Sequence, residues 1–247
     1  MAKKRSFKKF LTKLLKRVFI FFFASTLLVT IVYKWIPPPL TPLMLIRLVE
    51  QKKADQKLKL AKDWVSLKNI SQNMPLAVLV CEDQNFMNHH GCDLESIKKA
   101  NQDNKKGKRK RGASTISQQT AKNVFLWPES SWLRKGLEVY FTTLIEVIWG
   151  KERIMEVYLN VIEMGDGIYG AEKASQVYFK KKASDLNRNQ AALIAVCLPN
   201  PRKMSPSKIT TYRVKRQVWA LTQMSYFDYL DFEKKAKKAK KSKRNND

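Results

Sequence analysis

The sequence predicts a mostly α-helical domain preceded by a single membrane-spanning helix. Apolar residues recur with helical spacing along much of the chain, whereas the apolar–polar alternation typical of strands is weak. Only 8 of the 247 residues are glycine, which argues against β-barrels and against folds with glycine-rich turns. An uncharged run, 18–33, lies near the N-terminus. The apolar fraction, 44%, is enough to bury a core.

The predicted membrane anchor covers residues 18–36. Sixteen uncharged residues span about 24 Å as a helix, and Lys34 can extend its ammonium to the interface so that the span continues to residue 36. The prolines at 37–39 then end the helix. A cleaved signal peptide is the alternative, but the run is long for one and no A-x-A pattern precedes a cleavage site.

Basic residues dominate both ends of the chain. The segments 1–17 and 234–244 each hold eight basic residues and no acidic one, and the whole chain has a formal charge of +27. Such a surface suits nucleic acid, anionic lipid or a phosphorylated substrate. The positive-inside rule places 1–17 in the cytoplasm and everything after residue 37 outside the inner membrane. We therefore expect no nucleic-acid partner, and any transferase there needs an exported, already activated donor.

The exported part divides into a neck at 37–62, a globular domain at 63–225 and a basic tail at 226–247. Three cysteines cannot all pair, and no C-x-x-C pattern or histidine cluster indicates a zinc site. The lysine-rich segment 105–111 is predicted to be a solvated, mobile loop. Asp93 is expected to cap a helix, and Asn187 with Gln190 forms a capping-box pattern. The remaining helices are predicted at 71–81, 114–124, 135–149, 154–162 and 191–198.

Glu82 heads the first group of candidate functional residues, at 82–91. A carboxylate at the end of an apolar helix can lie in a cleft with a raised pKa, which suits a general base. The alternative is a polar helix end in which Asp83 caps the turn. His89 is expected to be structural.

A second group, at 112–123, places glycine and serine before a helix, where free backbone N–H groups attract anions. Ser114 and Lys122 belong to one polar row along this helix, and Gln119 and Asn123 belong to the row beside it. A solvated face is the alternative interpretation, although a pair of glutamines is unusual on a solvated helix face. The strip therefore indicates hydrogen bonding to a ligand.

In a third group, Arg134 and Lys135 lie one helical turn before Glu138. The simplest interpretation is an ordinary helical ion pair, worth about 0.2–0.5 kcal/mol. Between the second and third groups, the segment 125–132 carries Phe125, Leu126, Trp127 and Trp132. These side chains suit either a membrane-dipping patch or core packing.

Together with segments 151–160, 170–179 and 190–199, these groups resemble the bacterial peptidoglycan glycosyltransferases of family 51. That family includes monofunctional biosynthetic transglycosylases and the first domain of bifunctional penicillin-binding proteins. The resemblance covers about 65–205. Met155 and Lys180 stand where the family more often has Leu and Gly. No Lys-Thr-Gly occurs in the chain, so the monofunctional form is predicted.

The resemblance implies a lysozyme-like fold and the polymerisation of lipid II into β-1,4 glycan with inversion and release of undecaprenyl diphosphate. It implies Glu82 as the base and Glu138 as a second catalytic carboxylate, which either orients cations or holds a divalent ion such as Mg or Mn. No cofactor is required by the sequence. The residues expected to bind the substrate's diphosphate and sugars are Ser114, Gln119, Lys122, Asn123, Arg134 and Lys135. Asp83 and His89 are expected to support the site.

The expected partners are lipid II, the growing glycan chain and the lipid bilayer, with proteins of cell-wall synthesis or division as further candidates. Two other functions fit some of these features. One is a lytic muramidase with a lysozyme-like fold, and the other is a basic, membrane-tethered binding protein without enzymatic activity. The cation cluster favours the transferase, because a hydrolase has no departing diphosphate to stabilise. We also expect Glu82 and Glu138 to face one shared, positively charged groove.

Overall fold

The computed structural model describes residues 2–105 and 114–232. Of the loop predicted at 105–111, residues 106–111 lie outside the described residues. The lysine-rich part of the predicted tail also lies outside them. The chain divides into two compact units, 1–37 and 38–247.

The first unit is one long helix, α1 (Ala2–Val32). Its segment 9–32 is long and apolar enough to cross a membrane, and most of its apolar side chains are exposed. These properties are consistent with a single-pass membrane anchor. The helix ends four residues before the predicted end of the span. Tight turns continue to Ile36, whose amide donates to the Val32 carbonyl at 3.0 Å, and the prolines follow.

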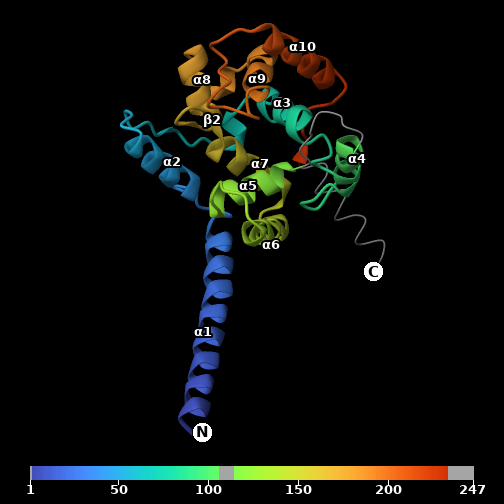
Figure 1. Ribbon diagram of the computed structural model, residues 1–247. Coiled ribbons are helices and arrows are strands. Elements are labelled where there is room, and N and C mark those ends of the chain that lie inside the picture. The colour runs from blue at the N-terminus through green and yellow to red at the C-terminus, as the bar shows by residue number, and fades with distance from the viewer. Residues whose placement is uncertain (1, 106–113, 233–247) are drawn as a thin grey trace. The chain divides into compact units, whose positions relative to one another are not determined.

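The second unit is mostly helical, as predicted, and Figure 1 shows α8, α9 and α10 at one end of it and α5 and α6 at the other. Its helices are α2 (Pro42–Lys53), α3 (Asn73–Glu82), α4 (Leu94–Lys105), α5 (Ile116–Phe125), α6 (Trp132–Ile148), α7 (Gly150–Val161), α8 (Ala171–Phe179), α9 (Arg188–Ala195) and α10 (Thr211–Ser225), with short 3-10 turns at Leu67–Asn69 and Ala183–Asp185.

Helix α3 forms the centre of the core. Seven consecutive side chains, 74–80, are buried, and a helix that is apolar on every side belongs in an interior. Pro75 lies in its first turn, where a missing N–H loses no helical hydrogen bond. Helices α9 and α10 pack against α3, while α6 and α7 pack against α5. The position of α3 is therefore fixed by α9 and α10.

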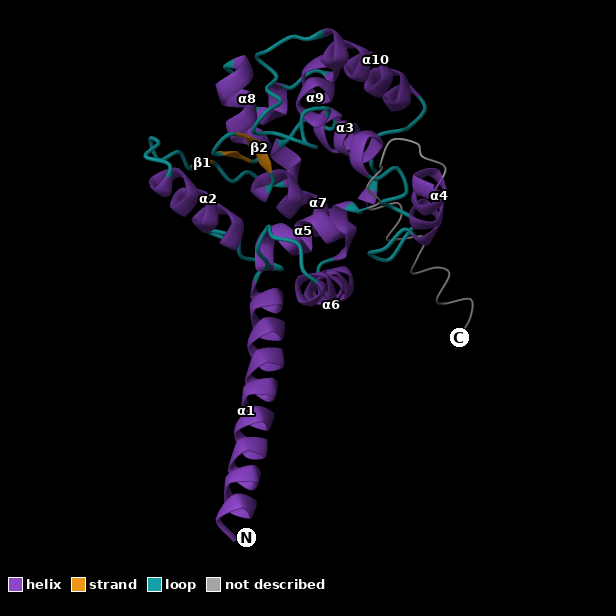
Figure 2. Cartoon of the chain, in the orientation of Figure 1, coloured by secondary structure: helices purple, strands orange, loops and turns teal. Residues whose placement is uncertain are grey.

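Three very short strands form a small sheet in the order β1-β3-β2, and Figure 2 draws its strands in orange. Strand β1 (Ala61–Lys62) runs parallel to β3 (Ile168–Tyr169), and β2 (Glu163–Gly165) runs antiparallel to it. Strands of two or three residues show no measurable alternation, which is why the sequence did not predict them. Because β1 pairs with β3 and α2 contacts α5, the segment expected as a neck packs within the second unit.

The predicted helix caps are confirmed. An Asp93 carboxylate oxygen accepts from the Ser96 amide at 2.9 Å at the start of α4. Asn187 and Gln190 form the expected reciprocal capping box at α9. At the C-terminal end of α8, Lys180 adopts a left-handed conformation with φ of 58°. Glycine adopts this conformation without strain, which gives a physical reason for the glycine more often found there in the family.

Candidate active site

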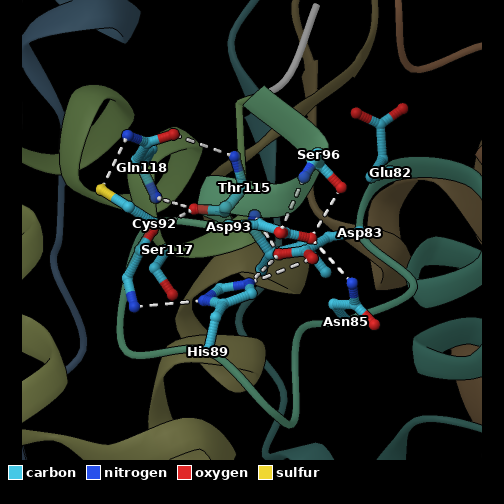
Figure 3. A network of polar contacts seen from close by, with 12 residues as sticks. Glu82, Asp83, Asn85, His89, Cys92, Asp93, Ser96, Thr115, Ser117 and Gln118 are labelled. Atoms are coloured by element: carbon cyan, nitrogen blue, oxygen red, sulfur yellow. Dashed lines mark hydrogen bonds and ion pairs between the residues drawn. The ribbon is translucent and has the colours of Figure 1, made fainter. Parts of the chain in front are cut away.

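Asp83 fixes the loop that follows α3. It ends the helix, and its carboxylate accepts from the backbone N–H of Ile116 at 3.0 Å and from Nε2 of His89 at 2.9 Å. Nδ1 of the same ring accepts from the Gly91 amide at 3.1 Å. Thr115 in turn donates its hydroxyl to the Gly91 carbonyl at 2.6 Å. These bonds hold the first group of residues against the N-terminus of α5 (Figure 3).

Glu82 points away from this network, as Figure 3 shows. One of its carboxylate oxygens accepts from Nε2 of Gln119 at 2.8 Å. Burial raises the pKa of Glu82, while the Gln119 bond and the charges of Arg216 and Lys122 oppose that rise. A glutamate with a raised pKa that remains able to ionise suits proton abstraction from a hydroxyl group.

A cavity of about 760 Å³ lies beside Glu82. Ser114 and Gln119 line it, as the second group predicts. The lining residues that the sequence analysis missed include Arg216 and Trp219 on α10, with the guanidinium 4.2 Å from the centre of the indole ring. Their spacing of three residues on a helix places both on one face, and that spacing was the available signal.

Glu138 is the centre of a separate cluster on α6. Its two carboxylate oxygens accept from Nη1 of Arg134 and from Nζ of Lys135, each at 2.5 Å. Glu138 is only 3% exposed and Arg134 is also buried, whereas the Lys135 side chain is 47% exposed. The cluster is therefore unlike the ordinary surface pair, because two of its three members are desolvated.

Lys122 interacts electrostatically with both carboxylates, Glu82 and Glu138. Burial lowers its pKa, Glu138 and Glu82 raise it, and Arg134 and Lys135 lower it further. Among the described residues, however, the lining of the cavity includes Glu82 but neither Glu138 nor the three cations. The expectation of one shared groove stays a prediction: Glu138 does not line this cavity and is bonded to its own cations, but both carboxylates raise the pKa of Lys122.

Asn123 is also placed differently from the expected contact with a ligand. Its side chain is buried, and its amide nitrogen donates to the carbonyl of Gln119 at 2.7 Å within α5. The aromatic segment that follows is divided between the two interpretations. Leu126 is 2% exposed and Phe125 stacks on Phe141 with ring centres 4.4 Å apart, whereas Trp132 is 94% exposed.

The structure defines a class of protein: a helical domain in which a half-buried carboxylate lies on a cavity, with three basic side chains on the neighbouring helices α5 and α6. Such a domain can activate a hydroxyl and stabilise a departing anion. A family model described as Transglycosylase matches residues 50–225. The chain belongs to the transglycosylase family, which confirms the resemblance that the motifs indicate.

Relatives from several bacteria carry the name biosynthetic peptidoglycan transglycosylase. The protein from Bacteroides thetaiotaomicron is 54% identical over 210 residues, which is 85% of each chain. The protein from Bdellovibrio bacteriovorus is 53% identical over 207 residues, 84% of this chain and 83% of its own. A relative from Pseudomonas putida is 46% identical over 215 residues, 87% of this chain and 91% of its own.

Proposed function

We propose that this chain is a single-pass membrane protein that polymerises lipid II in cell-wall synthesis. Membership of the transglycosylase family and the names of its relatives support a peptidoglycan glycosyltransferase activity. The observation that carries the mechanism is Glu82, a carboxylate of raised pKa that lies on a cavity, with the half-buried Lys122 nearby.

Glu82 is assigned as the general base. It takes the proton from the 4-hydroxyl of the acceptor GlcNAc while that oxygen forms a bond to C1 of the donor MurNAc. The bond from C1 to the α-linked diphosphate breaks at the same time, and undecaprenyl diphosphate leaves with its electron pair. The product is a β-1,4 linkage with inverted configuration. General-base assistance is needed because a sugar hydroxyl is a weak nucleophile.

The cations of α5 and α6 are assigned to the departing diphosphate. Arg134 can present two parallel N–H groups, whereas Lys122 and Lys135 act as point charges. Glu138 holds Arg134 and Lys135 in place through both of its oxygens. Ser114 and Gln119 bind sugar or phosphate from the cavity side, and Asn123 supports α5 from within.

A divalent ion does not fit the residues at Glu138. Both of its oxygens are bonded to cations, and no three His, Cys, Asp or Glu side chains of the described residues come together as metal ligands. We therefore assign the charge on the diphosphate to the three basic side chains.

The anchor gives the site access to a lipid-borne substrate. With 1–17 in the cytoplasm, the catalytic domain lies on the outer side of the inner membrane, where exported lipid II is present. The exposed Trp132 is the side chain of the aromatic segment best placed to enter the lipid interface. Proteins of wall synthesis or division remain candidate partners.

Full-length protein in lipid vesicles tests the function against both alternatives. Labelled lipid II should be converted into a glycan polymer, while purified sacculi should stay intact. Soluble fragments from sacculi without polymer would establish a muramidase. Saturable binding of lipid II without any turnover would establish a binding protein. Either result overturns the proposal.

A further inference from the structure

Two hydrogen bonds connect three helices to the carboxylate of Glu82. The hydroxyl of Tyr158, on α7, donates to Oε1 of Gln119 at 3.2 Å. The same amide of Gln119, on α5, donates from Nε2 to the Glu82 carboxylate, at the end of α3, at 2.8 Å. The three side chains form a continuous relay that ends at the proposed base.

The two hydrogen bonds at the ends of the Gln119 amide set the direction of this relay. Tyr158 is fully buried, and burial raises its pKa well above the usual range, so the hydroxyl keeps its proton. A protonated hydroxyl that donates holds the carbonyl end of the Gln119 amide toward itself. The N–H₂ end must then face Glu82. If the amide turned over, its carbonyl oxygen would face the carboxylate and disfavour the ionised form.

We propose that Tyr158 is a positioning residue for catalysis, which acts through Gln119 to keep Glu82 ionised and correctly oriented. This inference rests on the proposed function, because it assigns a task to Glu82 as base. It makes the tyrosine hydroxyl necessary for the pH range of the reaction, although that hydroxyl has no direct contact with the substrate.

Several other groups act on Glu82 and stay unchanged in a test of the tyrosine hydroxyl. They comprise neighbours on its own helix end and cations on α5 and α10: Cys81, Asp83, Lys122 and Arg216. Asp83 disfavours ionisation of Glu82, whereas the two cations favour it. Loss of the Tyr158 hydroxyl therefore removes one contribution that favours ionisation, and the acid limb of activity moves toward higher pH.

Tyr158→Phe tests this directly with full-length protein and lipid II in vesicles. The expected shift of the acid limb is roughly 0.5 to 1 pH unit upward, since one neutral hydrogen bond is removed. The KM for lipid II should change less than about twofold, because uniform binding is unaffected. A purely structural role would lower the rate equally at every pH and leave the limb in place.

Tyr169→Phe is the matched control. Tyr169 is likewise fully buried, and within the described part of the chain its hydroxyl makes no hydrogen bond. Its removal should leave the pH profile unchanged. A shift as large as that of Tyr158→Phe would overturn the proposal, since it would show a general effect of losing a buried hydroxyl.

Gln119→Met provides a second variant in case Tyr158→Phe does not fold, as judged by thermal unfolding. It removes both bonds and should shift the acid limb upward by at least as much. An unchanged limb in either folded variant overturns the relay. Failure of the wild-type protein to polymerise lipid II is a different result, because it removes the proposed function itself.

Discussion

Glu82 and Glu138 are the same chemical group in two different surroundings. Glu82 accepts one hydrogen bond from a neutral amide, lies on a cavity and has a raised pKa because it is buried. Glu138 is bonded through both oxygens to cations and has no place in the lining of that cavity. The first is suited to exchange a proton, and the second is suited to hold positive charge in a fixed position.

The difference shows that role follows from neighbours rather than from residue type. Desolvation without an adjacent strong ion pair favours the neutral acid, whereas two bonded cations compensate a buried carboxylate. Both carboxylates raise the pKa of Lys122, so this one side chain is sensitive to both regions. The following predictions separate the two carboxylates.

Glu82→Gln should have the largest effect. Loss of the general base lowers the polymerisation rate by about 10²–10⁴-fold, while the fold and lipid II binding are retained. Rate, circular dichroism and lipid II binding are measured on the same preparation. Glu129→Gln, an exposed glutamate, serves as the control and should keep wild-type activity. Normal polymer from Glu82→Gln removes that residue from its assigned role.

Glu138→Gln should reduce both function and stability. It leaves Arg134 buried with only a neutral acceptor, which lowers the free energy of unfolding by about 1–3 kcal/mol. Misplaced cations should lower kcat/KM for lipid II by roughly 10–100-fold. Denaturant unfolding and steady-state kinetics measure the two effects. Full stability and full activity in this variant would show that the ion pairs of Glu138 contribute to neither.

Lys135→Ala should weaken capture of the diphosphate lipid by about tenfold, the lower end for a hydrogen bond to a charged group, since the lysine is half exposed. Vesicle-based binding of lipid II measures this change, and Lys135→Arg should restore much of the affinity. Lys215→Ala, on an exposed face of α10, removes the same charge as a control. Equal losses in both alanine variants would point to net charge alone.

The pH dependence of stability should distinguish Glu82 from an ordinary glutamate. A raised pKa means that the native state holds the proton more tightly than the unfolded state. Its stabilising contribution is complete below the unfolded pKa and is lost as the pH rises through the folded pKa. Glu82→Gln should therefore unfold at higher denaturant concentration than wild type at pH 7, with the gap closing toward pH 4. A gap independent of pH contradicts the raised pKa.

Lys180→Gly should have the smallest effect, a gain of about 1 kcal/mol in the free energy of unfolding. The left-handed conformation at the end of α8 strains any residue with a Cβ atom. The residue lies outside the proposed site, so polymerisation should not change. Thermal unfolding of the two proteins decides the matter, and a destabilised glycine variant would show that the lysine side chain makes a compensating contact.

The sequence alone determined the helical class, the apolar N-terminal helix, two helix caps and the family. These follow from local information: side-chain periodicity, capping residues and residue order along the chain. The order of the motifs also brought Glu82, Gln119 and the cation group forward as candidates. No long-range geometry was needed for any of these predictions.

Only the tertiary structure decided which candidates meet. It placed Arg216 and Trp219 of α10 beside Glu82, more than 130 residues along the chain, and it turned Asn123 inward to its own helix. It also left Glu138 out of the lining of that cavity and joined Tyr158 to Glu82 through Gln119. Burial and contact between distant helices set these outcomes, because the pKa and partners of a side chain depend on packing that no local pattern encodes.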